Sequence, residues 1–232
     1  MITTRRAALL VVIGESLITP VLILPILLFD NFAPTMASVP IRTLLAGQVT
    51  VVGATAAFFL YVYHANGEIP YRLGLRVAAL VAAGGLIALR TFLFWSRIGP
   101  PGTSRLPDFV GALALAAFFI AAAWKSASSG PLPVLRIAVP VAIVGQALSV
   151  PSALGSVIQQ GTTLLQDIAH PVVQVLPQPG LDMRSMYILF LVNSVIWLYS
   201  VLAMLLFLLV MWRKRAKSDP MAAPELGLAS QG

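Results

Sequence analysis

The chain has 232 residues, of which 59% are hydrophobic and only 10% are charged, and its mean hydropathy is +0.92. Soluble domains carry about 25% charged residues, so this composition excludes a water-soluble globule and predicts an integral membrane protein. The chain has no cysteine, which excludes disulfides and iron–sulfur clusters, and its net charge of +7 favours contact with anionic lipid over nucleic acid.

The apolar residues gather in six long segments, and a helix needs about 20 of them to cross the hydrocarbon of a bilayer. The sequence therefore predicts an all-α fold, a polytopic bundle of six transmembrane helices that forms one domain over residues 1–217. The expected spans lie near 7–29, 41–63, 75–95, 108–124, 134–158 and 186–212. Residues 218–232 are rich in alanine and proline and are expected to form a disordered cytoplasmic tail.

The first segment resembles a signal peptide at its start, because Met1 to Arg6 is short and basic. The apolar run that follows is some 23 residues long, which exceeds the usual h-region of about 7–15 residues. We therefore interpret this segment as a span that stays in the protein, with cleavage as the less favoured alternative.

The distribution of lysine and arginine predicts the orientation, because cytoplasmic loops of membrane proteins carry an excess of these residues. With the N-terminus inside, ten cations fall in inner segments and four in outer loops. The inner ones are Arg5, Arg6, Arg72, Arg76, Lys125, Arg136, Arg213, Lys214, Arg215 and Lys217, and the outer ones are Arg42, Arg97, Arg105 and Arg184. Both termini are therefore expected in the cytoplasm, in a plasma or inner membrane, with the cluster 213–217 against anionic lipids.

Two outer loops carry further structural signals. Residues 96–107 contain a Gly-Pro-Pro-Gly run, which predicts an irregular loop. In the long loop 159–185, apolar residues recur at helical spacing from Thr163 to Val175, which predicts a short amphipathic helix on the membrane surface. A re-entrant element or a lid over the bundle is the alternative interpretation of this pattern.

Two charged residues lie inside expected spans, where a charge costs about 2.5–3.5 kcal/mol on insertion scales. Glu15, in the first span, is either a proton or cation site or a structural carboxyl that bonds across helices. Arg90, in the outer half of the third span, either snorkels to the interface beside Trp95 or binds an intramembrane acid or an anionic ligand. Glu15 is the only acid expected deep in a span, so the two side chains are candidates to pair.

Three uncharged polar residues, Gln48, Gln146 and Asn193, complete the candidate intramembrane polar site. Their structural interpretation is hydrogen bonding between helices, which is worth only about 0.6 kcal/mol on average. Gln48, Arg90 and Asn193 share the outer half of the bilayer by depth, so they would line an outward-opening pocket if they faced one another. Depth is readable from the sequence, whereas the direction in which each side chain faces is not.

No arrangement of residues in the sequence predicts catalysis. The two histidines, His64 and His170, fall on opposite sides of the membrane and cannot share a metal or a haem. We predict no catalytic, metal-binding or cofactor-binding residues, and no cofactor. The favoured function is a non-catalytic membrane subunit or scaffold, with the lipid bilayer and other membrane subunits as partners and no nucleic acid. The alternatives are a small transporter or permease subunit with a pocket around Arg90, Gln48 and Asn193, and an enzyme that acts on lipid.

Overall fold

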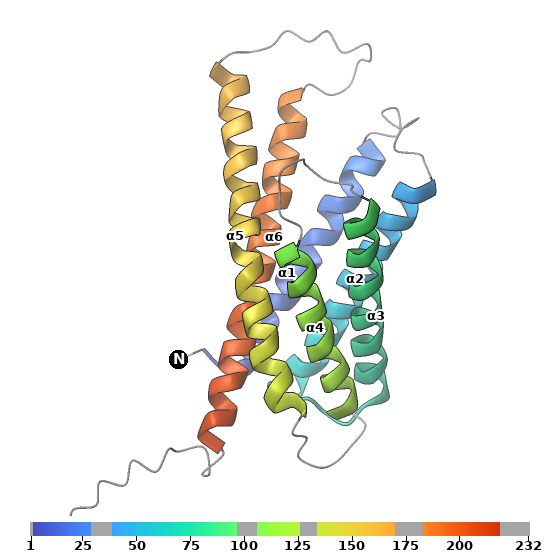
Figure 1. Cartoon of the computed structure of the whole chain (residues 1–232), viewed down its shortest axis with the longest axis vertical. Helices are drawn as coiled ribbons and strands as arrows, with labels where there is room; N and C mark the ends of the chain where they lie inside the picture. The colour runs from blue at the N-terminus through green and yellow to red at the C-terminus, as the bar shows by residue number, and fades with distance from the viewer. Residues whose placement is uncertain (1, 29–38, 97–105, 126–133, 170–182, 219–232) are drawn as a thin grey trace, which may run out of the picture.

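The computed structural model describes residues 2–28, 39–96, 106–125, 134–169 and 183–218. These residues form six α-helices and no strand, so the predicted all-α fold is confirmed. The helices are α1 (Thr4–Leu28), α2 (Val39–His64), α3 (Leu73–Ser96), α4 (Leu106–Lys125), α5 (Val134–Ala169) and α6 (Met183–Ser218) (Figure 1). Of the predicted tail, Ser218 belongs to α6 and the rest lies outside the described residues.

Five of the helices, α2 to α6, contain segments that are long and apolar enough to cross a membrane. Every helix of the bundle also turns large apolar side chains outward, where a soluble protein would carry polar groups. Examples, one from each helix in chain order, are Ile13, Leu60, Leu80, Ile120, Val144 and Leu202. The chain is therefore a multi-pass helical membrane protein, as its composition predicts.

The six helices pack as a ring in chain order. Each helix packs against the helix before it and the helix after it, and α6 packs against α1 to close the ring. Figure 1 shows the helices standing side by side, with the long α5 and α6 together at one edge. Helices that follow each other in sequence commonly pack as antiparallel neighbours, and here this rule runs through the whole chain. The ring leaves a central space toward which every helix turns one face.

The first helix begins, and the last helix ends, at the same end of the bundle, which we call the terminal end (Figure 1). At this end Lys214 Nζ donates a hydrogen bond to Glu68 Oε1 at 3.1 Å, which links α6 to the connection between α2 and α3. The guanidinium of Arg5 lies 4.6 Å from the ring centroid of Tyr63, a cation–π contact between α1 and α2. These contacts join the start of α1 to the end of α2, and the end of α6 to the connection between α2 and α3. We call the opposite end the far end.

The connection between α2 and α3 is a tight turn that the sequence specifies locally. Asn66 and Gly67 adopt left-handed backbone conformations with φ of 58° and 84°, which asparagine and glycine accommodate best. The N–H of Gly67 donates to the Val62 carbonyl at 2.8 Å and so caps the end of α2. A Cβ on Gly67 would lie 2.7 Å from the Cβ of Thr4, so the turn also seats the start of α1.

The half of the ring nearer the terminal end is filled by aromatic side chains. Five phenylalanines from α2, α4 and α6 are fully buried, and their ring centroids lie 4.8 to 6.4 Å apart, mostly edge to face. We call this set the aromatic core, and it consists of Phe58, Phe59, Phe118, Phe119 and Phe207. Buried alanines on α1, α3 and α5 pack around it and let the helices approach closely. This half of the bundle is therefore close-packed and dry.

Two glycines set the contact between α4 and α5. A Cβ on Gly145 would collide with the Cβ of Ala114 and lie 3.2 Å from the Cα of Gly111. A Cβ on Gly111 would lie 2.7 Å from the carbonyl oxygen of Gly145. Only glycine fits at either position, so this pair fixes the height at which the two helices meet.

The fifth helix runs well past the predicted end of its span. The prediction ends the span at 158, whereas the 36 residues of α5 continue through Pro151 to Ala169, a length of about 54 Å at about 1.5 Å per residue. No proline occurs between 152 and 169, so the backbone meets nothing that stops a helix there. Residues 163–169 of the predicted amphipathic helix are therefore helical, but they continue α5 instead of starting a new helix. The remainder of that prediction, 170–175, lies outside the described residues, so a surface helix there stays a prediction.

Except for the end of α6, the remaining boundaries lie within a few residues of their predicted positions. α3 ends at Ser96 and α4 begins at Leu106, so these helices flank the predicted loop 96–107, whose central residues 97–105 lie outside the described part of the chain. α6 begins three residues before the predicted start at 186 and continues to Ser218, beyond the predicted end at 212. Arg213 and Lys214 therefore stand on the last turns of a helix, not in a loop.

Candidate functional site

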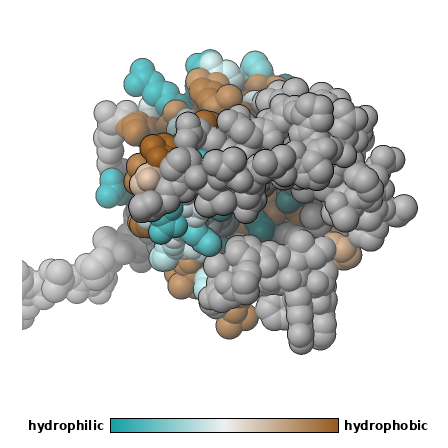
Figure 2. All heavy atoms as spheres, turned by 90° about the horizontal axis from the view of Figure 1, so that it is seen from above, coloured by the Kyte–Doolittle hydropathy of each residue, from teal (hydrophilic) through white to brown (hydrophobic). Residues whose placement is uncertain are grey.

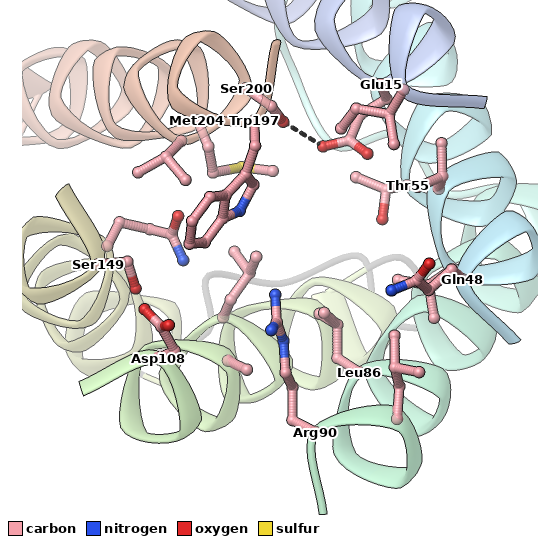
Figure 3. Close-up of a pocket in the computed structure, with 18 of the residues that line it drawn as sticks. Glu15, Gln48, Thr55, Leu86, Arg90, Asp108, Ser149, Trp197, Ser200 and Met204 are labelled. Carbon is pink, nitrogen blue, oxygen red and sulfur yellow. Dashed lines mark hydrogen bonds between the residues drawn. The ribbon is translucent and has the colours of Figure 1, made fainter. Parts of the chain in front are cut away.

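A cavity of about 330 Å³ lies in the centre of the ring, on the far-end side of the aromatic core. All six helices contribute residues to its wall (Figure 3). The polar and charged side chains that line it are Glu15, Gln48, Thr55, Arg90, Asp108, Gln146, Ser149, Asn193, Trp197 and Ser200. The rest of the wall is apolar and consists mainly of valine and leucine. A mixed wall of this kind around a central space is typical of a small-molecule site between helices.

All five residues of the candidate polar site line this one cavity. They come from five different helices, with only α4 not represented among Glu15, Gln48, Arg90, Gln146 and Asn193. The sequence places each of them inside a span, and the structure adds that they face the same space. Polar residues that serve only helix packing form hydrogen bonds in pairs, in separate helix–helix interfaces. Here five helices turn their polar residues toward one space, which indicates a binding site.

Glu15 is buried on the α1 side of the cavity, and its Oε1 accepts a hydrogen bond from Ser200 Oγ at 2.6 Å. The close packing of α1 against α6 makes this bond possible. A Cβ on the neighbouring Gly14 would lie 3.0 Å from the ring of Tyr199, so a larger residue there would push the two helices apart. The carboxyl is thus held in place from one side, while its other side faces the cavity (Figure 3).

Arg90 directs its guanidinium into the middle of the cavity from α3 (Figure 3). This orientation differs from the expected alternative in which the side chain snorkels to the interface beside Trp95, whose side chain lies outside the described ones. Its Nε is buried without a hydrogen-bond partner. Glu15 lies on the opposite wall and bonds to Ser200 instead, so the expected pairing of Arg90 with Glu15 is not formed among the described residues.

Asp108 is a second acid at the cavity, and the sequence analysis missed it. It lies in the first turn of α4, and its Oδ2 accepts a hydrogen bond from Ser152 Oγ on α5 at 2.9 Å, while its Oδ1 is buried without a partner. An acid in the first turn of a helix normally indicates a cap at the membrane edge. What distinguishes Asp108 from such a cap is its partner Ser152 on the neighbouring helix. The spacing of residues along the sequence does not reveal that partner.

The three amide side chains stay unbonded. Among the described residues, Gln48, Gln146 and Asn193 form no side-chain hydrogen bond, although all three line the cavity. The expected alternative, in which each amide ties two helices together, is therefore not what the described residues show. Trp197 adds an indole that reaches into the cavity from α6 (Figure 3). The amide and indole groups around the cavity are therefore available to form hydrogen bonds with a molecule inside it.

Figure 2 looks onto the far end of the bundle, and the described residues that are visible there include both hydrophilic and hydrophobic side chains. The part of α5 beyond the predicted span supplies polar residues, and the hydroxyls of Thr162 and Thr163 each donate to the Gln159 carbonyl at 2.9 Å. Leu165 and Ile168 on the same stretch are exposed. The described part of this end is therefore of mixed polarity.

The described residues contain no group of three metal-ligating side chains. His64 ends α2 at the terminal end, away from the cavity, and His170 lies outside the described residues. The cavity residues supply carboxyl, guanidinium, amide, hydroxyl and indole groups. Such a set binds polar solutes through hydrogen bonds and charge.

The chain matches no family model, no curated protein and no solved structure. The site is accordingly interpreted from its own geometry.

Proposed function

We propose that the protein is a small transporter or permease subunit that binds a polar solute in the central cavity. The observation that carries this proposal is the convergence of five intramembrane polar residues, from five helices, on one cavity. Three of them are amides whose side chains form no hydrogen bond among the described residues. Polar side chains in a membrane domain are costly, and those that face a common water-filled cavity are typical of substrate pathways. A scaffold needs no such space.

The proposal includes six crossings with both termini in the cytoplasm of a plasma or inner membrane. Two observations support α1 as the sixth span: its 25 residues correspond to about 37 Å of helix, and α1 and α6 meet the same end of the bundle (Figure 1). The excess of cations in the connections at the terminal end supports placing that end inside. Residues 213–217 would then contact anionic lipid headgroups.

The cavity would communicate with the outside in this orientation. The aromatic core closes its terminal side, because Phe58 follows the cavity residue Thr55 by one turn of α2 and Phe207 follows Met204 by one turn of α6. Access from the far end is supported by the absence of a comparable aromatic cluster among the described residues there. Transport would require the aromatic core to part, so the structure corresponds to an outward-facing or occluded state in this proposal.

A non-catalytic subunit or scaffold is the second candidate. It is favoured by the length of α5 and α6, which at 36 residues each span about 54 Å, against a hydrocarbon thickness of about 30 Å. Two helices that project together from the bundle offer a surface for another subunit. This surface and the cavity are compatible in one protein, so the experiments have to test the cavity directly.

The absence of cysteine in the natural chain allows a direct test of water access. We expect Gln48→Cys and Asn193→Cys, each the only thiol in its variant, to react in intact vesicles with a charged, membrane-impermeant methanethiosulfonate reagent. Leu202→Cys, which faces outward from α6, and Phe207→Cys, in the aromatic core, are the matched controls and should react slowly. Equal, slow reaction at all four positions would mean that the cavity holds no water, and the transport proposal would fall.

Uptake is the functional test. The purified chain is reconstituted into liposomes, which are incubated with an equimolar mixture of amino acids, sugars, nucleosides and small carboxylic acids, washed, and analysed by mass spectrometry. We expect at least one solute to accumulate above protein-free liposomes, and Arg90→Ala to abolish the excess. If no solute accumulates, or if Arg90→Ala accumulates it equally, the site described here is not a transport site.

A further inference from the structure

A guanidinium and a carboxyl group stand on opposite walls of the cavity. Arg90 enters from α3, and Glu15 faces it across the open space from α1, with Ser200 and Thr55 beside it (Figure 3). No ion pair joins Arg90 to Glu15 or to Asp108 among the described residues. An arginine keeps its charge in almost any protein environment, so its charge inside the bundle has to be balanced by the contents of the cavity or by a charge at a distance.

The two walls differ in what they can bind. The guanidinium of Arg90 offers several N–H donors in one plane and no acceptor, a geometry that fits a carboxylate through two parallel hydrogen bonds. The wall of Glu15 and Thr55 offers a carboxyl and a hydroxyl, which accept hydrogen bonds from an ammonium group. Ser200 already donates to Glu15 Oε1 and fixes the direction of that carboxyl.

The wall between Arg90 and Glu15 is mixed. Leu86, Val51 and the indole of Trp197 offer apolar and aromatic surface, and the amides of Gln48, Gln146 and Asn193 add polar groups. A ligand that reaches both Arg90 and Glu15 therefore also contacts apolar surface with its carbon atoms. The cavity volume of about 330 Å³ lies at the lower end of the range for small-molecule sites, about 300–1,000 Å³, which limits the ligand to a small solute.

We infer that the ligand is a small zwitterion of the amino-acid class, with its carboxylate at Arg90 and its ammonium group at Glu15. This inference rests on the proposed function and specifies its substrate. A simple anion would leave the side of the Glu15 carboxyl that faces the cavity without a hydrogen-bond donor, and a simple cation would leave the guanidinium of Arg90 without an acceptor. A zwitterion satisfies both walls and adds no net charge to the membrane interior, where net charge is costly.

Asp108 also belongs to the wall of the cavity, and its carboxyl accepts a hydrogen bond from Ser152 Oγ. It forms no ion pair with Arg90 among the described residues, so the guanidinium keeps its donors for a ligand.

The test compares ligands that differ in one charge. The full-length protein, purified in detergent, is melted in the presence of each of the twenty common amino acids, and the amino acid that raises the melting temperature most is then compared with its decarboxylated amine and its deaminated acid. We expect saturable binding of the amino acid, with Kd at least about tenfold lower than that of either analogue, since each analogue loses one charged contact. If the amine or the acid binds as well as the amino acid, the zwitterion is the wrong class.

Two substitutions assign the charges to their walls. Glu15→Gln keeps an oxygen that can accept from Ser200, and it should abolish the preference for the amino acid over the deaminated acid while binding of the acid persists. Arg90→Lys keeps the positive charge without the planar fork and should weaken binding of the amino acid and the deaminated acid by similar factors. Ile137→Ala, at an outward-facing position of α5, is the control and should bind as the natural chain does. If Glu15→Gln leaves the preference intact, Glu15 does not face the ammonium group.

The outcome separates this inference from the proposed function. If the liposomes accumulate only solutes without both charges, such as a sugar or a monocarboxylic acid, transport stands and the zwitterion is excluded. If no solute accumulates and no amino acid shifts the melting temperature, both proposals fall together. An amino acid that accumulates and competes with the others at the same site supports both.

Discussion

The two halves of the ring are built from the same six helices and have opposite interiors. Toward the terminal end, the aromatic core fills the centre and excludes solvent, whereas toward the far end the centre is a cavity with charged and polar walls. On α2, Thr55 and Phe58 are separated by a single turn, and this turn marks the boundary between the halves. The packed core and the polar cavity are therefore separated along the axis of one bundle, so substitutions in the two halves should have different consequences.

The largest loss of stability is expected from the aromatic core. Phe58→Ala removes a fully buried ring that contacts Phe59, Phe118 and Phe119, and the cost should be about 3–5 kcal/mol of unfolding free energy. Thermal unfolding of the purified protein in detergent measures the effect. Leu60→Ala, on the lipid-facing side of the same helix, is the control and should cost clearly less. Equal losses at the two positions would mean that the terminal half is not the packed core of the protein.

A smaller loss is expected at the contact between α4 and α5, close to the cavity. Gly145→Val forces a side chain against Ala114 and Gly111 and should cost about 1–3 kcal/mol, the usual range for overpacking. Gly155→Val is the matched control on the same helix, because a Cβ there meets nothing within 4 Å. If both variants melt alike, α4 and α5 do not approach as closely as the glycine pair requires.

The exposed ion pair at the terminal end should contribute little. Glu68→Gln removes the carboxylate that Lys214 contacts at 3.1 Å, and the loss should stay below about 1 kcal/mol because both groups are exposed to solvent. The melting temperature, measured at low and at high salt, tests this, since salt screens the pair in the natural chain and should shrink the difference. A loss comparable to that of Phe58→Ala would show that the connection between α2 and α3 holds the bundle together.

The smallest effect on stability is expected in the cavity. Asn193→Ala removes an amide that forms no side-chain hydrogen bond among the described residues, so unfolding should change by less than about 0.5 kcal/mol. Solute accumulation in liposomes should nevertheless fall, which separates binding from folding. Were this variant to melt as early as Gly145→Val, Asn193 would have a structural role and the functional difference between the halves would disappear.

The sequence predicts the helical fold well, because about 20 apolar residues in a row have few alternatives to a membrane helix. It fails at the ends of α5 and α6. Hydropathy falls where a helix leaves the bilayer, but backbone hydrogen bonding continues until a residue such as proline interrupts it, so α5 runs to Ala169 and α6 to Ser218. Hydropathy therefore marks the membrane boundary and not the end of the helix.

The candidate site could be predicted in part. The depth of Glu15 and Arg90 follows from counting residues along a helix, and both line the cavity. Which residues share the space depends on how each helix is rotated in the ring, and that is set by packing, such as the contact of Gly111 with Gly145. Asp108 was missed for this reason: at the start of α4 it resembles a helix cap, and only the packing of α5 against α4 brings Ser152 to it.

The closure of the ring by α6 against α1 has a consequence for how the protein is made. The bond between Ser200 and Glu15 joins residues 185 positions apart. A ribosome that adds about 5–20 residues per second needs roughly 10–40 seconds between the two. During this interval the first helix waits in the translocation machinery or the bilayer with a carboxyl that lacks its hydroxyl donor. The contact between α1 and α6 therefore forms only after Ser200 has been synthesised, so the ring closes late relative to the insertion of α1.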